Sequence, residues 1–373
     1  MSIQINAAFD SGNIKLVGIE GDRVDLEIVK DHLSDFYQWF HFRVAGAKGR
    51  TITFRILNAG GSAYAFGWPG YKARWSADRE LWRTTADSDY ADGVLSFTQA
   101  IETDIVWFAY FAPYSMERHH DLVSRIALAP GVTHRELGVT LDGQPMDLLT
   151  LGTGAKQVWL YARQHPGESM AEWWMEGALE MLVDPGNATA KALREKATFH
   201  IVPNMNPDGS RRGHLRTNAA GINLNREWHA PSMEKSPEVF LVRQAMDETG
   251  VDFAMDVHGD EAIPANFLAG YEGIPSWTDA HGEKFYEFAR RLAGATPDFQ
   301  LDLGYEKSAP GRANLSMSTN QLAERFGAVS MTLEMPFKDH DANADPEFAW
   351  SPARCKALGV SCLETLAGYI DEI

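Results

Sequence analysis

Cysteine is nearly absent from this chain of 373 residues, which contains only Cys355 and Cys362. The two lie seven residues apart in a segment with a helical pattern. At a rise of about 1.5 Å per residue their Cα atoms are about 10 Å apart, which is beyond the reach of a disulfide. We therefore expect two buried, reduced thiols.

Basic residues are also scarce. There are 34 Lys and Arg residues against 51 Asp and Glu, which gives a formal charge of -17. Nucleic acids and anionic membrane surfaces require a basic footprint, so we expect neither as a partner. No uncharged apolar run approaches the roughly 18 residues of a membrane span, and residues 1–10 lack the basic and apolar regions of a secretory signal. A cytoplasmic location is therefore expected.

Signatures of other protein classes are missing as well. The sequence has no Gly-x-Ser-x-Gly motif, which excludes the nucleophile elbow of a serine hydrolase. The Gly-Thr-Gly at residues 152–154 precedes a strand pattern and lacks a third glycine, so it indicates a turn and not a nucleotide-binding loop. His119 and His120 lie in a polar stretch, and we interpret them as structural or exposed residues, not as metal ligands.

The composition that is present is typical of a globular protein, with 45% apolar and 23% charged residues and enough length for two domains. Residues 38–44 and 51–57 alternate apolar and polar side chains, and residues 95–101 and 105–112 continue the series of strands. We therefore predict a small all-β sandwich domain over residues 1–115.

From residue 116 onward the pattern alternates between strands and helices. Apolar runs predict strands at residues 158–162, 199–202, 251–255 and 329–333, and helical periodicity predicts helices at 116–126, 168–182, 237–248, 278–292 and 352–370. This order predicts an α/β domain over residues 116–373, with a mixed or parallel sheet flanked by helices.

Two short segments carry the strongest chemical signal. Residues 163–169 read Arg-Gln-His-Pro-Gly-Glu-Ser, and residues 256–259 read Asp-Val-His-Gly. His165, Glu168 and His258 supply two imidazoles and one carboxylate, the ligand set of a catalytic zinc that keeps a fourth position for water. Alone, a His-x-x-Glu pair is often solvated or caps a helix. The ensemble is informative because each ligand follows a predicted strand, where ligands collect in open α/β sheets.

Further polar motifs follow in an order that resembles a known enzyme family. Residues 203–209 read Pro-Asn-Met-Asn-Pro-Asp-Gly, Arg216 comes next, and residues 223–228 read Asn-Leu-Asn-Arg-Glu-Trp. Together with the His-x-x-Glu motif, the second His and a late Glu, this order resembles the zinc metallocarboxypeptidases, peptidase family M14. Phe-Asp-Ser-Gly-Asn at 9–13, Trp-Phe-His-Phe-Arg at 39–43 and Pro-Tyr-Ser-Met-Glu at 113–117 are similar to the cytosolic carboxypeptidase subgroup of bacterial type.

This resemblance implies a metallocarboxypeptidase that removes C-terminal residues from peptides or protein tails. It implies one zinc ion per chain, held by His165, Glu168 and His258. By position, Glu334 after the predicted strand 329–333 matches the general base, and Arg216 matches the residue that stabilises the oxyanion. Asn225 and Arg226 match the clamp that binds the terminal carboxylate of the substrate.

Two departures from the family pattern stand out. Asn223 occupies the place of an Asp that supports a zinc-bound His, and an amide is a weaker acceptor. A Tyr that lies upstream of the base in the digestive enzymes has no counterpart in residues 312–326, which favours the cytosolic subgroup. The cytosolic relatives typically remove glutamate, which requires a basic pocket. Among Lys307, Arg312 and Arg325 we favour Arg312, although Thr319 aligns with the pocket Arg of the family.

Two other functions stay open. The same metal ligands could serve a zinc amidohydrolase that acts on N-acyl amino acids or cell-wall peptides. The fold and the clamp could also form a non-catalytic tail-binding module, which the presence of Glu334 and all three ligands disfavours. For the carboxypeptidase we expect the N-terminal domain to shape the rim of the cleft and to limit which tails enter.

Overall fold

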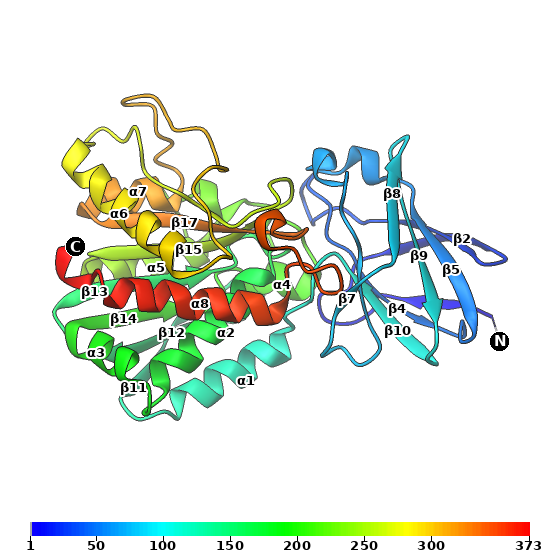
Figure 1. Cartoon of the computed structure of the whole chain (residues 1–373), viewed down its shortest axis with the longest axis horizontal. Coiled ribbons are helices and arrows are strands. Elements are labelled where there is room, and N and C mark those ends of the chain that lie inside the picture. Colours follow the sequence, from blue (N-terminus) through cyan, green and yellow to red (C-terminus); the bar gives the residue numbers. More distant parts are fainter. Residues whose placement is uncertain (1) are drawn as a thin grey trace.

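The structure, a computed structural model, describes residues 2–373, and two five-stranded sheets build its N-terminal part (Figure 1). One sheet has the order β1-β4-β10-β6-β7 and the other β2-β3-β5-β9-β8. The strands are β1 (Gln4–Asn6), β2 (Lys15–Glu20), β3 (Arg23–Glu27), β4 (His41–Ala45), β5 (Arg50–Ile56), β6 (Arg74–Ser76), β7 (Arg83–Thr84), β8 (Asp87–Ala91), β9 (Val94–Ile101) and β10 (Ile105–Ala109). Two short 3-10 helices, η1 (Ala59–Gly61) and η2 (Ala65–Gly67), lie between β5 and β6.

Aromatic side chains fill the space between these two sheets. Phe42 and Phe108 come from β4 and β10 of the first sheet, and Phe54 and Phe97 come from β5 and β9 of the second. The ring centroids of Phe54 and Phe108 are 4.7 Å apart, and all four rings are buried. Alternate residues of a strand point to one face, so the alternation in the sequence produces this shared core. The predicted β-sandwich is confirmed.

A mixed sheet of seven strands forms the C-terminal part, in the order β11-β12-β14-β13-β15-β17-β16. The four central strands β14, β13, β15 and β17 are parallel to one another. The strands are β11 (Val132–Val139), β12 (Pro145–Gly152), β13 (Lys156–Ala162), β14 (Ala197–Val202), β15 (Phe253–Asp260), β16 (Phe267–Ala269) and β17 (Val329–Pro336). The predicted α/β fold with a mixed sheet is confirmed.

Helices cover both faces of this sheet. The helices are α1 (Met116–Ala127), α2 (Met170–Val183), α3 (Ala188–Lys196), α4 (Pro207–Arg212), α5 (Pro237–Thr249), α6 (Asp279–Ala295), α7 (Ser318–Phe326) and α8 (Pro352–Ala367), with short 3-10 helices η3 (Leu224–Arg226), η4 (Asp341–Asn343) and η5 (Ile370–Glu372). In β13, Val158 and Leu160 face a core shared with α2, α3, α6 and α8, whereas Trp159 and Tyr161 face a second core shared with α5 and α7. Burial on both faces explains why the central strands read as continuous apolar runs.

Helices α2 and α8 pack closely because glycine occurs at their contact. A Cβ atom on Gly177 of α2 would lie 2.5 Å from Cα of Lys356, and one on Gly359 of α8 would lie 2.6 Å from the carbonyl oxygen of Trp174. Cys355 and Cys362 lie on α8, and both are free and buried, as predicted. Within residues 2–373 no helix combines the length and the apolar character that a membrane crossing needs.

The two strands nearest the predicted site are longer than the sequence indicates. The apolar runs predict strand ends at residues 255 and 333, but β15 continues to Asp260 and β17 to Pro336. His258 and Glu334 therefore lie inside strands and not after them. The physical reason is pairing: β15 and β17 stay in register from Phe253 to Asp260, and β16 adds a further antiparallel neighbour to β17. Residues 258–260 therefore continue β15 through their pairing with β17.

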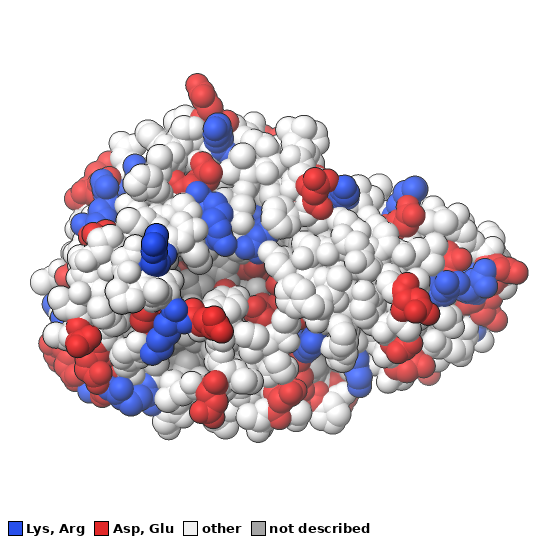
Figure 2. Space-filling model, turned by 90° about the horizontal axis from the view of Figure 1, so that it is seen from above, with Lys and Arg blue, Asp and Glu red and all other residues white. Residues whose placement is uncertain are grey.

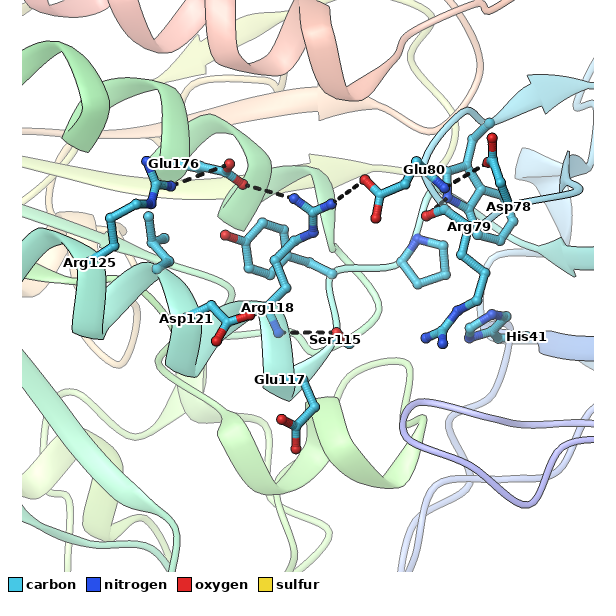
Figure 3. A pocket seen from close by; sticks show the side chains of 14 residues that line it. His41, Asp78, Arg79, Glu80, Ser115, Glu117, Arg118, Asp121, Arg125 and Glu176 are labelled. Carbon is cyan, nitrogen blue, oxygen red and sulfur yellow. Dashed lines mark hydrogen bonds and ion pairs between the residues drawn. The ribbon is translucent and has the colours of Figure 1, made fainter.

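Charged side chains join the β-rich and α/β parts. Arg118 of α1 donates to Glu80 at 2.7 Å and lies 3.8 Å from Glu176 of α2 (Figure 3). These residues line a polar pocket of about 460 Å³, which contains none of the predicted site residues. The buried guanidinium of Arg74 in β6 donates to the carbonyl oxygen of Phe337 at 2.9 Å.

Candidate active site

Three side chains meet at the carboxyl end of the central strands. His165 and Glu168 lie in the loop between β13 and α2, and His258 lies in the neighbouring strand β15. Glu168 contacts both imidazoles at 2.7 Å, through Oε1 to His165 Nδ1 and through Oε2 to His258 Nδ1. The two Nδ1 atoms are 3.1 Å apart, and all three side chains are buried. The sequence motifs thus converge on one point, and we call this group the His165 cluster.

The donor set of the His165 cluster fits a divalent metal ion. Two nitrogen atoms that face each other across 3.1 Å and a carboxylate can all donate electron pairs to one centre. Burial and the charge of Arg216 lower the pKa of His165 to about 3, so its ring is neutral, the form that binds metals. Burial opposes ionisation of Glu168, but His165 and His258 lower its pKa and keep the carboxylate charged.

An oxygen acceptor orients each imidazole through its other nitrogen. His165 Nε2 lies 3.1 Å from Asn223 Oδ1, and His258 Nε2 lies 2.9 Å from Asp256 Oδ2. Such contacts fix the tautomer of a ligating histidine. The contact of Asn223 with a cluster histidine agrees with the sequence interpretation. Asp256 was missed, although its place two residues before His258 in a strand puts both side chains on one face.

Glu334 lies beside the His165 cluster because it is the register partner of His258 on β17. Its side chain is buried, and within residues 2–373 its Oε2 atom has no hydrogen-bond partner. Burial and the charge of Glu168 raise the pKa of Glu334 well above its usual range, although His258 acts in the opposite direction. A carboxyl group with a raised pKa and an open acceptor oxygen is suited to exchange protons with a substrate or water.

A tyrosine approaches Glu334 from the loop that precedes α7. The hydroxyl of Tyr305 donates to Asp260 Oδ2 at 2.7 Å and lies 3.3 Å from Glu334 Oε1. Residues 312–326 contain no tyrosine, and the structure shows that Tyr305, seven residues before that range, lies beside Glu334. The sequence offered no signal for this contact, because only the path of the loop brings Tyr305 to the strand end.

The residues matched to substrate binding come from the segment between α4 and α5. The Arg216 guanidinium lies over the rings of Tyr64 and Phe36, at 5.3 and 5.7 Å from their centroids. Burial and the charge of Arg216 lower the pKa of Arg226, so the two cations lie close enough to repel. Asn225 Oδ1 accepts a hydrogen bond from Ser318 N at 2.9 Å. Within residues 2–373 neither guanidinium forms an ion pair, which suits an anionic ligand.

The basic candidates for a glutamate pocket are scattered. Lys307 donates to the Tyr286 hydroxyl at 2.8 Å, and Arg325 pairs with Asp247 at 2.7 Å. Arg312 is exposed in the loop before α7, and no described contact joins it to the His165 cluster. Thr319 is buried, with its hydroxyl oxygen 2.7 Å from that of Thr332.

The surface is hollowed beside the β-rich part. Figure 2 shows this hollow with Lys and Arg side chains on its rim and acidic side chains within it. Clustered charge of one sign at the mouth of a cleft attracts ligands of the opposite sign. A basic rim on a chain of net charge -17 therefore favours a ligand with an anionic end.

Comparison with known proteins agrees with this geometry. Residues 5–111 match the cytosolic carboxypeptidase N-terminal domain, and residues 122–268 match the zinc carboxypeptidase family. A metallo-carboxypeptidase from Pseudomonas aeruginosa, solved in complex with (2-guanidinoethylmercapto)succinic acid, is 45% identical with a TM-score of 0.97, and the match covers 99% of each chain. An uncharacterised protein from Zymomonas mobilis is 59% identical over 100% of this chain and 98% of its own.

Human cytosolic carboxypeptidase 1 is 30% identical over 64% of this chain, and the match covers only 23% of the human protein. The fold and the matching families define a metallocarboxypeptidase, a hydrolase that acts on the C-terminal ends of peptides. The chain belongs to the M14 zinc carboxypeptidase family, in the group that carries the cytosolic carboxypeptidase N-terminal domain. The family, the fold and the enzyme class expected from the sequence are confirmed.

Proposed function

We propose that this protein is a zinc-dependent carboxypeptidase in which His165, Glu168 and His258 hold one Zn²⁺ ion. The observation that carries the proposal is the meeting of two imidazoles and a carboxylate, with contacts of 2.7 to 3.1 Å, next to the buried carboxyl of Glu334. Two nitrogen ligands and one oxygen ligand are typical of a catalytic zinc with an open position.

Each remaining group has a distinct task in peptide hydrolysis. When bound, the zinc ion would polarise the scissile carbonyl and acidify a water molecule. Glu334 accepts a proton from the attacking water and returns it to the leaving amine, so the C–N bond breaks with a neutral amine. Arg216 donates to the carbonyl oxygen as negative charge develops there. Asn225 and Arg226 bind the terminal carboxylate, which restricts cleavage to the last residue.

The experiment is a peptide panel combined with metal analysis. Peptides that differ only in a last residue of Glu, Asp, Lys or Phe are incubated with metal-free and zinc-loaded protein. Release of the last residue is expected only with zinc, and a peptide with an amidated C-terminus is expected to resist because it offers no carboxylate to Arg226. Turnover of N-acyl amino acids without release from peptides would favour the amidohydrolase. Peptide binding without cleavage would favour the tail-binding module.

Glutamate as the preferred last residue is the narrower part of the proposal. Arg312 supports it through an exposed guanidinium. An exposed charge pair contributes about 0.2–1 kcal/mol, so Arg312→Ala should lower the ratio of kcat/KM for Glu over Phe by about 1.4- to fivefold. Arg290→Ala, in an exposed helix-surface ion pair with Glu287, is the matched control and should leave the ratio unchanged. An unchanged ratio in Arg312→Ala would remove this residue from the pocket.

The division of the chain at residue 115 is also part of the proposal. The last strand of the β-rich part, β10, ends at Ala109, and the first helix of the α/β part begins at Met116. With this division, Arg216 lies in the second domain and its guanidinium contacts the rings of Tyr64 and Phe36, which lie in the first.

A further inference from the structure

A loop of the N-terminal domain forms hydrogen bonds with the segment that contains Arg216. The Asp31 carboxylate is buried and accepts four hydrogen bonds from three consecutive residues of the other domain. The donors are Leu215 N at 2.7 Å, Arg216 N at 2.8 Å, and Thr217 N and Oγ1 both at 3.0 Å. One side chain thus fixes the backbone on both sides of Arg216.

The same loop also contacts the Arg216 side chain. Asp31 N donates to the carbonyl oxygen of Phe36 at 2.8 Å, which closes residues 31–36 into a compact turn. The ring of Phe36 lies under the Arg216 guanidinium at 5.7 Å. The turn therefore holds Arg216 at its backbone through Asp31 and at its cation through Phe36.

The turn makes further contacts with the segment around Arg216. His32 N donates to His214 Nε2 at 3.1 Å. A Cβ atom on Gly221 would lie 2.4 Å from the carbonyl oxygen of Leu33, so a larger residue at position 221 would push the two segments apart. Within residues 2–373 no Lys, Arg or His side chain pairs with Asp31, and its charge is satisfied by the N–H and hydroxyl donors alone. A buried carboxylate bonded in this way is costly to disturb.

We propose that Asp31 is a positioning residue for Arg216, so that the N-terminal domain completes the active site of the α/β domain. This inference rests on the proposed role of Arg216 at the developing oxyanion. A donor contributes most when it is already fixed at the place where the charge develops. A displacement of about 1 Å in such a group can reduce the rate by about 10²-fold.

The test is Asp31→Asn in the full chain, with Asp35→Asn as the matched control because Asp35 is exposed and, within residues 2–373, pairs only with Lys30. We expect Asp31→Asn to lower kcat by about 10- to 100-fold with KM changed less than about twofold. Its affinity for a phosphonate analogue of the hydrolysed peptide should fall in parallel. Its affinity for the released amino acid, which binds through Asn225 and Arg226, should stay the same, as should its zinc content.

The double variant distinguishes a role in positioning Arg216 from a loss of activity that does not depend on Arg216. If Asp31 acts through Arg216, then Asp31→Asn combined with Arg216→Ala should be no slower than Arg216→Ala alone. Independent, multiplying effects would overturn the inference, as would equal losses of phosphonate and product affinity. If Asp31→Asn does not fold, Phe36→Leu supplies the readout, with an expected two- to fivefold loss of kcat for a lost cation–π contact of about 0.5–1 kcal/mol. An unchanged kcat in that variant would also count against the inference. Failure of the wild type to cleave any peptide would instead reject the proposed function.

Discussion

Two groups of histidine and carboxylate side chains lie in the α/β domain, and they are alike in composition. The His165 cluster combines two imidazoles with Glu168, and a second group combines His119 and His120 with Asp147. In both, the ligand-type atoms lie within 4.8 Å of one another. We call the second group the His119 cluster. Composition and proximity alone would give the two groups the same function.

Their surroundings are different. Both ring nitrogens of His119 contact carboxylates, with Nδ1 at 2.6 Å from Glu172 Oε1 and Nε2 at 3.3 Å from Asp147 Oδ2. Burial lowers the pKa of His119, but Glu172 and Asp147 outweigh burial and raise it to about 9. The ring is therefore protonated at neutral pH, with its two nitrogens directed at two separate carboxylates. In the His165 cluster each ring directs one nitrogen at the shared point and the other at an outer acceptor.

The comparison teaches that the direction of the donor atoms separates the two groups, because His258, like His119, contacts a carboxylate at each nitrogen. In the His165 cluster Glu168 bridges the facing Nδ1 atoms of two imidazoles, so three donors address one point. In the His119 cluster the two nitrogens of His119 are directed at two separate carboxylates, and Glu172 also pairs with Arg163 at 2.8 Å. We therefore expect one zinc ion per chain, bound at the His165 cluster. The following variants test this difference between the two clusters.

The largest effect is expected from His258→Ala, which removes a ligand from the His165 cluster. On the proposed function, loss of zinc would remove both the acidified water and the polarisation of the carbonyl, so peptidase activity should fall by more than about 10⁴-fold. Zinc content by mass spectrometry should fall from one equivalent to none. His120→Ala, the corresponding change in the His119 cluster, should keep one equivalent and full activity. Loss of zinc from His120→Ala would contradict the contrast between the clusters.

A smaller effect is expected from Glu334→Gln, because Glu334 is the buried register partner of His258 in the His165 cluster. Glutamine keeps the shape but cannot accept the proton, so kcat should fall by about 10² to 10⁴-fold while zinc stays bound. Wild-type kcat in this variant would remove Glu334 as the base. Parallel loss of zinc would show instead that Glu334 supports the metal.

The sequence predicts the parts of this site that follow from local patterns. Apolar runs located β13, β15 and β17, and the motif order located His165, Glu168, His258 and Glu334 near their ends. The geometry now shows these four side chains side by side. Such placement can be read from the sequence because parallel strands have their carboxyl ends at a common edge.

Other contacts depend on the fold and could not be read from local patterns. The contacts of Asp31 with residues 215–217 and of Tyr305 with Glu334 join segments that no periodicity connects. The edge strand β11 and its neighbour β12 also escaped prediction, and in β11 the exposed residues lack the apolar run of a central strand. Likewise His119 reads as one more polar residue until the fold brings Asp147 and Glu172 to its two nitrogens.

The oxygen atoms that contact the Nε2 atoms of His165 and His258 offer a test of the metal site in which every side chain of the His165 cluster is kept. His165 Nε2 contacts the neutral oxygen of Asn223, whereas His258 Nε2 contacts the carboxylate of Asp256. A carboxylate acceptor makes a ligating imidazole a better donor, and such partners change metal affinity by about 10- to 100-fold. Asn223→Asp should therefore bind zinc about tenfold more tightly in a competition titration with a chelator.

The control for this variant is Asn187→Asp, which adds the same charge at the N-cap of α3, where either residue accepts the capping hydrogen bond. It should leave zinc affinity unchanged. Equal tightening in both variants would assign the effect to net charge, and no tightening in Asn223→Asp would show that the outer acceptor of His165 does not control the metal.

The smallest effect on activity is expected from His119→Gln, which should act on stability and its pH dependence. The folded pKa of about 9 lies above the unfolded value of about 6.5, so the contribution of His119 is fully present below pH 6.5 and is lost as the pH rises through 9. The free energy of unfolding of the variant should be lower than that of the wild type by about 1–3 kcal/mol at pH 6, and the two should converge above pH 9. Urea unfolding at several pH values measures this difference.

His229→Gln, at an exposed position, should follow the wild type, and all three proteins should keep one zinc equivalent. A constant difference in the free energy of unfolding across this pH range would mean that His119 is neutral in the folded protein.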